Sequence, residues 1–354
     1  MRFEFPFLWF TQPIKAHPRP WRFFKIDGLM VNAYEILHND SVAQRVRKEG
    51  VHRYVEFDGL IAMDSGGYLF MKRGEMDVTP EVILTLYEES KPNFGVVLDF
   101  PLTPNLPREV VEERLSKTLE NTKRMLELRR TTNPLLIPVI HGHDGETIKR
   151  YVKRLQEIGD FNIYGIGSLV PSVFNTKGVG GIHNVVRVIS LVRTLLPDKI
   201  IHVFGVGSAI TMHLMFYAGV DSIDTTSWRT KAAFGAIQLP GSGDRYITPR
   251  KRHKHYRGLS EEERRILDEC KCPACKKEGL EGLVRSFKLR ALHNAWVYQG
   301  EVERARKLMR SGEYGEYVKD LIRENRTYMK VLELIESLQE RNRFSDELSS
   351  RRDI

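Results

Sequence analysis

The stretch LIAMDSGGY, residues 60–68, joins a short apolar run to a carboxylate, a hydroxyl and two glycines. The apolar run is typical of a buried strand, and paired glycines allow a tight turn and a close approach of backbone to a ligand. Asp64 at such a turn is either the cap of a following helix or a working group. The position alone leaves both interpretations open.

Six more stretches are short apolar or β-branched runs that end in small or polar residues. They are residues 29–36, 94–99, 135–140, 162–167, 199–205 and 220–224. Apolar residues at helical spacing lie between them, over residues 107–130, 146–158, 181–196 and 208–218. Apolar strands that alternate with helices predict an α/β fold with a parallel sheet. A (β/α)8 TIM barrel fits best, with its eighth strand unplaced. An open doubly wound sheet is the alternative, although no GxGxxG or P-loop pattern supports it.

The pattern changes after Gly241 and predicts three parts. Residues 1–241 would form the barrel. Residues 242–300 hold a basic run and all three cysteines, and we expect them to form an inserted zinc-binding subdomain. Residues 301–354 are mostly helical and charged, and apolar residues such as Leu321 and Leu332 are expected to pack on the barrel.

Composition limits the classes of protein to consider. The chain has 354 residues, 41% hydrophobic and 29% charged, with a net charge of +9. The sequence has no apolar run of about 18 residues, so no membrane span is expected. Its aromatic N-terminus is interrupted by Glu4 and Pro6, and we interpret it as folded chain and not as a signal peptide. We therefore expect a cytoplasmic protein. The positive charge fits a polyanionic partner, or simply a solvated charged surface.

The cysteines predict a metal site. Cys270, Cys272 and Cys275 form a CxCxxC motif, and an odd, clustered set does not suggest disulfides. With His293 they would make a closed tetrahedral zinc site, which is structural because no position is left for a reactive water. His253 and His255 are the competing fourth ligands.

In a barrel, functional residues gather at the C-terminal ends of the strands. These ends hold Asn32, Asp64, Asp99, His141 with His143, Gly167 with Ser168, Gly205 to Gly207, and Asp224. Three carboxylates and two histidines would therefore surround the same end of the barrel. Helix capping could explain any one of them, but explains the whole set poorly.

Several motifs follow one order along nearly the whole chain. They are VNAYEI (31–36), AMDSGGY (62–68), VVLD (96–99), IGSLVP (166–171), FGVGS (204–208), GVDSIDTTSWR (219–229), and CxCxxC with a downstream His293-Asn294 pair. In this set and order the chain resembles the tRNA-guanine transglycosylase superfamily. The resemblance implies a (β/α)8 barrel with a zinc subdomain, and an enzyme that exchanges a base on a nucleic-acid sugar.

The resemblance also implies residue roles. Exchange with retention at C1′ takes two displacements, so one carboxylate must hold the sugar covalently. Asp224 would be this nucleophile, with Asp221 as its competitor if the motif is shifted. Asp64 would protonate the departing guanine and deprotonate the incoming base, and Asp99 would accept hydrogen bonds from a guanine-like base. The other expected base contacts are Ser65, Gly66, Gly67, Gly167, Ser168 and Leu169.

Several residues depart from the family pattern, and these departures bear on whether the substrate is tRNA or DNA. Leu69 stands where the tRNA enzymes usually have Gln, and IHGHD, with His141 and His143, replaces their usual QG. A histidine there could hydrogen-bond the base or a phosphate, or support the site from behind. TTSWR replaces LPTR, and we expect the C-terminal RNA-binding domains of the archaeal enzymes to be missing. These features favour the DNA-guanine transglycosylase branch, which inserts 7-deazaguanines such as preQ0 into DNA.

Other functions remain open alternatives. They are base exchange in tRNA, a non-catalytic nucleic-acid-binding paralogue, and a hydrolase that releases the base to water. The presence of both Asp64 and Asp224 argues against the non-catalytic alternative. A homodimer or an accessory protein is also possible.

A basic run over residues 245–258, RYITPRKRHKHYRG, is the candidate contact with nucleic acid and begins with Arg245. Clustered cations bind phosphates without reading sequence, and interleaved tyrosines such as Tyr246 could stack on bases. A solvated loop is the alternative interpretation. The expected phosphate-binding residues are Arg229, Arg250, Lys251, Arg252, Lys254 and Arg257.

Overall fold

The computed structural model describes residues 3–74, 78–103, 105–169, 181–248 and 257–350, with side chains up to residue 341. Its centre is one parallel sheet in the order β5-β4-β3-β2-β1-β9-β8-β7-β6. The strands are β1 (Phe7–Thr11), β2 (Gly28–Asn32), β3 (Leu60–Asp64), β4 (Phe94–Val96), β5 (Leu135–Ile137), β6 (Val139–Ile140), β7 (Ile163–Ile166), β8 (Ile200–Val203) and β9 (Ser222–Thr225).

The sheet closes into the expected (β/α)8 barrel. β5 and β6 are two halves of one predicted strand, interrupted at Pro138, and β5 pairs with β4 while β6 pairs with β7. Proline has no N–H to donate to the ladder, which accounts for the interruption. The unplaced eighth strand is β1, which pairs with β2 on one side and β9 on the other.

Alternate residues of the strands fill the inside of the barrel. Trp9, flanked by Phe7 and Phe94, is fully buried there. The full interior cluster is Phe7, Trp9, Met30, Leu60, Ala62, Phe94, Val96, Ile137, Val139 and Ile163. Their neighbours, such as Leu8, Phe10 and Ile61, belong to the larger cluster between strands and helices. This alternation is the packing expected of a barrel, in which one strand face fills the interior.

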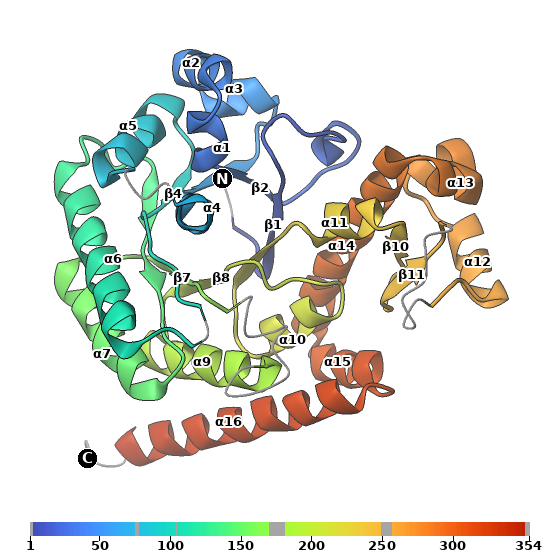
Figure 1. Ribbon diagram of the computed structural model, residues 1–354. Coiled ribbons are helices and arrows are strands. Elements are labelled where there is room, and N and C mark those ends of the chain that lie inside the picture. The colour runs from blue at the N-terminus through green and yellow to red at the C-terminus, as the bar shows by residue number, and fades with distance from the viewer. Residues whose placement is uncertain (1–2, 75–77, 104, 170–180, 249–256, 351–354) are drawn as a thin grey trace.

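Helices surround the barrel (Figure 1). They are α1 (Ala33–Leu37), α2 (Asp40–Glu49), α3 (Val51–Val55), α4 (Gly67–Arg73), α5 (Pro80–Ser90), α6 (Arg108–Leu128), α7 (Gly145–Ile158), α9 (Ile182–Leu195), α10 (Thr211–Tyr217) and α11 (Ser227–Ala233), with a short 3-10 turn at Pro20–Arg22. The expectation of one strand over residues 29–36 was wrong at its end. β2 stops at Asn32, whose side chain accepts the Tyr34 N–H and caps α1.

A small subdomain lies to one side of the barrel (Figure 1). It contains the antiparallel pair β10 (Ala236–Gln238) and β11 (Asp244–Tyr246), with α12 (Glu261–Asp268) and α13 (Pro273–Arg285). Its core includes Ile237, Leu267, Cys272, Leu283 and Leu292. A small separate core of this kind gains from a metal, because it buries too little apolar surface by itself.

Helix α14 (Phe287–Ser311) joins this subdomain to the barrel. Its buried Arg306 donates to Asp27 and to the Pro6 carbonyl near the start of β1. The expected boundary between residues 300 and 301 falls inside this helix. Helices α15 (Tyr314–Ile322) and α16 (Arg326–Ser350) follow, and α16 runs along α9 on the outside of the barrel (Figure 1). No helix in the described residues is long and apolar enough to span a membrane.

Candidate active site and zinc site

A cavity of about 300 Å³ opens at the C-terminal ends of the barrel strands. It brings together three carboxylates, those of Asp64, Asp99 and Asp224. Four apolar side chains, of Met30, Val96, Val139 and Phe204, form part of its wall. The remaining lining residues are Thr11, Tyr68, Pro101, Leu102, Thr103, Gly167, Ser168 and Gly205. An apolar pocket with a few convergent polar groups suits a flat heterocyclic ligand.

Asp224 is held firmly within β9. The hydroxyl of Thr11 donates to its Oδ2 at 2.8 Å, and the Gly205 N–H donates to its Oδ1 at 2.6 Å. The side chain is only 9% exposed. Asp221, the competing residue, lies just before β9, where its carboxylate pairs with Arg193 and accepts the Ile201 N–H. Only Asp224 of these two lines the cavity.

Asp64 ends β3 beside Asn32, the residue opposite it in β2. The Asn32 amide donates to Asp64 Oδ2 at 2.6 Å. Asp64 borders the cavity but is otherwise enclosed by protein, and burial is the main cause that raises its pKa to about 7. The charges of Asp99 and Asp224 raise this pKa further. A carboxyl group that titrates near neutrality is suited to both giving and taking a proton.

Asp99 follows β4 and is also nearly buried. The Ser65 hydroxyl donates to its Oδ1 at 3.2 Å. Gly67 is required here by space, because a Cβ atom at that position would lie 2.3 Å from the Asp99 carbonyl oxygen. The two glycines after Asp64 therefore let α4 begin directly against Asp99, which accounts for the DSGG stretch.

Six of the nine expected base contacts do not line the cavity. His141 is fully buried behind Asp99, with Nε2 3.0 Å from Asp99 Oδ2. His143 does not line the cavity, and burial is the first cause that lowers its pKa. Ser65, Gly66 and Gly67 are not among the lining residues either; Ser65 donates to Asp99, and the two glycines form the start of α4. Leu169 is fully buried and also lies outside the lining.

Three of the expected base contacts do line the cavity, namely Asp99, Gly167 and Ser168. A Cβ on Gly167 would lie 2.6 Å from His141 Cε1, so glycine lets the loop pass close to that ring. Thr11, Tyr68, Leu102 and Phe204 are lining residues that the sequence did not single out as contacts. Thr11 could have been found only by placing β1, because it is the last residue of that strand.

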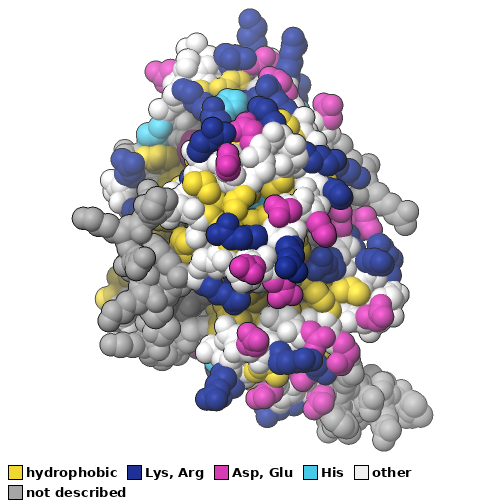
Figure 2. All heavy atoms as spheres, turned by 90° about the vertical axis from the view of Figure 1, so that its right-hand side faces the viewer, with side chains coloured by type: hydrophobic (Ala, Val, Ile, Leu, Met, Phe, Trp, Pro, Cys, Tyr) yellow, Lys and Arg dark blue, Asp and Glu magenta, His cyan; other side chains and the backbone are white. Residues whose placement is uncertain are grey.

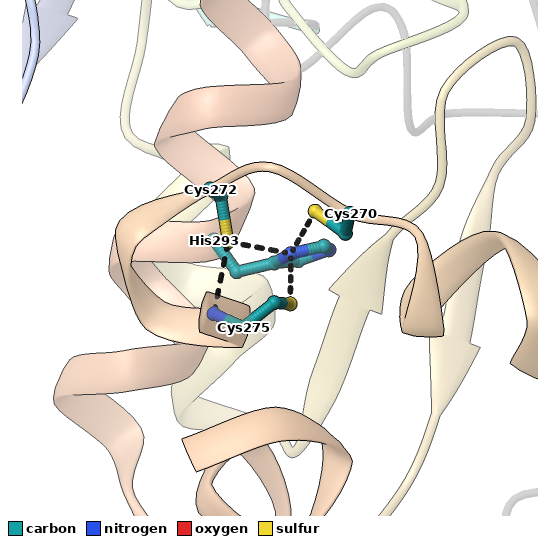
Figure 3. Close-up of side chains that lie close together, drawn as sticks. All are labelled: Cys270, Cys272, Cys275 and His293. Carbon is teal, nitrogen blue, oxygen red and sulfur yellow. Dashed lines mark hydrogen bonds between the residues drawn. The ribbon is translucent and has the colours of Figure 1, made fainter. Parts of the chain in front are cut away.

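The four predicted metal ligands converge (Figure 3). The sulfurs of Cys270, Cys272 and Cys275 lie 3.8, 3.5 and 3.4 Å from His293 Nδ1. In a tetrahedral zinc site with Zn–S of about 2.3 Å and Zn–N of about 2.0 Å, sulfur and nitrogen are separated by about 3.5 Å. The cluster therefore fits a structural zinc ion. The competitors His253 and His255 lie outside the described residues.

The surroundings of the cluster support the same conclusion. His293 Nε2 donates to the Gln238 carbonyl at 2.8 Å, which leaves Nδ1 free to bind metal. The Cys275 N–H donates to the sulfur of Cys272 at 3.2 Å, as expected for a thiolate at the start of a helix. Because α14 carries His293 and β10 carries Gln238, the metal would fasten the subdomain to the helix that reaches the barrel.

The predicted phosphate contacts are only partly described. Arg250, Lys251, Arg252 and Lys254 lie outside the described residues. Arg257 is exposed and 3.3 Å from Glu263, while Arg229 donates to the His17 carbonyl and lies over the rings of Trp228 and Phe287. On the face toward the subdomain, basic and acidic side chains are intermixed (Figure 2). The described part of this face therefore gives no single-sign track for a polyanion.

Comparison with known proteins decides the family. The family model described as queuine tRNA-ribosyltransferase matches residues 13–327, most of the chain. The chain belongs to the queuine tRNA-ribosyltransferase family. The match spans the three cavity carboxylates, the four residues of the zinc cluster and helix α14.

Three similar proteins from archaea show how far the likeness extends along the chain. The chain is 29% identical to the tRNA-guanine(15) transglycosylase of Pyrococcus furiosus over 340 residues, or 92% of this chain and 53% of that protein. It is 28% identical to the proteins of the same name from Methanopyrus kandleri and Methanocaldococcus jannaschii, covering 90% and 84% of this chain and 66% and 44% of those proteins. The chain thus spans about half the length of most of these curated relatives.

Proposed function

We propose that the chain is a guanine transglycosylase, a pentosyltransferase that replaces a guanine of a nucleic acid with a 7-deazaguanine base. The arrangement of the three carboxylates carries this proposal. Asp224 accepts hydrogen bonds from two donors, Asp64 has a pKa raised to about 7, and Asp99 accepts a hydrogen bond from the Ser65 hydroxyl. These three environments suit a nucleophile, a proton carrier and a base-recognition group.

The proposed reaction is a double displacement. Asp224 attacks C1′ of the target nucleotide, the C1′–N bond to guanine breaks, and Asp64 gives its proton to the departing base. The incoming base then attacks C1′, the ester bond to Asp224 breaks, and the base returns a proton to Asp64. Asp99 accepts the N–H groups of either base. Two inversions retain the configuration of the sugar.

The polymer is the point on which the relatives and the sequence motifs differ. The relatives are named as tRNA enzymes, which supports tRNA as the substrate better than the DNA that the sequence favoured. DNA remains the second candidate because His141 and Leu69 depart from the residues usual in the tRNA enzymes.

The test is incorporation. Purified protein is incubated with preQ0 and either bulk tRNA or duplex DNA, and each polymer is digested and analysed by mass spectrometry. A deazaguanine ribonucleoside is expected, and a deazaguanine deoxynucleoside alone would establish the DNA alternative. Abasic polymer with free guanine would instead establish a hydrolase, and an unchanged polymer would contradict the proposed activity.

The raised pKa of Asp64 gives a pH prediction. Asp64 is protonated below about pH 7 and ionised above it. Guanine release requires the protonated form, so the single-turnover rate of release should fall as the pH rises through about 7. Asp99→Asn removes a negative neighbour and should move this fall to lower pH, measured with saturating polymer. A rate that is constant from pH 6 to 8, or a shift to higher pH in the variant, would contradict the role of Asp64.

A further inference from the structure

Two buried histidines lie behind two of the three cavity carboxylates. His141 Nε2 is 3.0 Å from Asp99 Oδ2, and His202 Nε2 is 3.6 Å from Asp224 Oδ1. The two residues are 0% and 1% exposed, so they have almost no contact with bulk solvent. Asp64 differs, because its neighbour is the amide of Asn32 and not a histidine.

A serine hydroxyl holds each histidine from its other side. Ser168 Oγ is 2.8 Å from His141 Nδ1, and Ser222 Oγ is 2.9 Å from His202 Nδ1. Ser168 Oγ already accepts the Leu102 N–H at 2.7 Å, so its own hydrogen is available for His141 Nδ1. A neutral His141 then carries its hydrogen on Nε2, facing Asp99. The backbone of Ser168 is left-handed, with φ 62°, an uncommon conformation that keeps its hydroxyl in this place.

Ser222 can fix the tautomer of His202 in the same way. If Ser222 donates to Nδ1, the hydrogen of a neutral His202 lies on Nε2 and faces Asp224. The opposite tautomer would aim a nitrogen lone pair at a carboxylate, which is repulsive. Among the described residues, His143 lies near His141, and the Phe204 ring packs edge-on against His202.

Neither Nε2 forms a hydrogen bond with any residue that the structure describes. Buried polar groups without a partner are rare in folded proteins and call for an explanation. Each of these two faces a carboxylate oxygen at short range, and hydrogen bonds in active sites often tighten only when substrate is bound. The unpaired groups therefore point to contacts that form during the reaction.

We propose that His141 and His202 are positioning residues, each oriented by a serine so that its Nε2–H stabilises the ionised form of Asp99 or Asp224. The shared proton of the three-carboxylate cluster then stays on Asp64. This inference rests on the proposed function. It explains how neighbouring carboxylates take different roles, since like charges this close do not all ionise equally well. It also makes His141 a determinant of base recognition without contact to the base.

The two histidines should have separable effects. At metal sites, loss of a contact behind a ligand typically lowers affinity or activity about 10-fold to 100-fold, and we expect the lower end of this range behind a carboxylate. His141→Leu should raise KM for the incoming base at least about tenfold, with less effect on sugar transfer. His202→Leu should slow formation of the covalent intermediate by about tenfold and leave that KM unchanged. His141→Gln and His202→Gln, which keep an N–H donor, should recover most of each loss.

Nitrogen NMR of the histidine rings tests the arrangement without any assay of activity. In wild type, each ring should carry a hydrogen on Nε2. A hydrogen on Nδ1 alone in either ring would overturn the proposal for that residue. So would Leu variants with wild-type thermal stability and unchanged kinetics, or Gln variants as impaired as Leu. Absence of exchange by wild type would contradict the proposed function, while the NMR result would still decide the tautomers.

Discussion

Replacing Asp224 with asparagine should abolish base exchange, with a loss on the order of 10³-fold or more. The amide cannot attack C1′ and hold the sugar as an ester, although it keeps the size of the side chain. Its carbonyl oxygen can still accept the Gly205 N–H, and its NH2 group can donate to the Thr11 hydroxyl. Folding should therefore be little changed. Incorporation of labelled base into the polymer, followed over time, measures the loss.

A neighbouring aspartate supplies the matched control. Asp221→Asn changes the same functional group three residues earlier, outside the cavity, where it pairs with Arg193. This variant should lose some thermal stability and retain exchange. Two results would contradict the nucleophile role of Asp224. One is exchange by Asp224→Asn at a rate near wild type, and the other is loss of exchange only in a folded Asp221→Asn variant.

Removal of zinc should unfold the subdomain. Cys272 is fully buried in the core of that subdomain, together with Leu267 and Leu283. Structural zinc contributes about 10–16 kcal/mol in zinc-finger peptides, and a loss of even about 5 kcal/mol would lower the melting temperature by on the order of 10–20 °C. Calorimetry with and without a chelator, and on Cys272→Ala, measures this effect.

Metal analysis completes that experiment. One zinc per chain is expected for wild type and for Lys271→Ala, which changes an exposed residue between two of the ligands. Cys272→Ala should bind much less. A folded, metal-free wild-type protein with an unchanged melting temperature would rule out the structural role of zinc.

The strands that the sequence predicts well are those with an apolar run and a polar end. Residues 60–64 form β3 with the predicted bounds, and Asp64 stands at its end as expected. The first strand was missed because FLWFT lies between Pro6 and Pro13 in an aromatic N-terminus, without a clear period. Its neighbours β2 and β9 lie far from each other along the chain. The pairing that closes the barrel is therefore a tertiary fact that no local pattern reveals.

The motifs predict which residues lie at the C-terminal ends of the barrel strands, but they do not predict which side chains reach the cavity. Asp64, Asp99 and Asp224 do, whereas His141 turns behind Asp99. A strand end fixes position along the barrel axis and leaves the orientation of the next few residues to loop geometry. The same limit applies to the basic run, where Arg245 is a buried partner of Glu263 and not a free cation. Charge counted along a sequence includes such buried pairs.

The most direct measurement is to find the covalent intermediate. Protein and tRNA are mixed without incoming base, the reaction is stopped with acid, and peptides are analysed by mass spectrometry. The account predicts a sugar adduct on the peptide at Asp224 that disappears when preQ0 is added before the acid. An adduct on Asp64 or Asp221 would contradict the assigned roles. Base exchange with no adduct on any residue would contradict the double displacement itself.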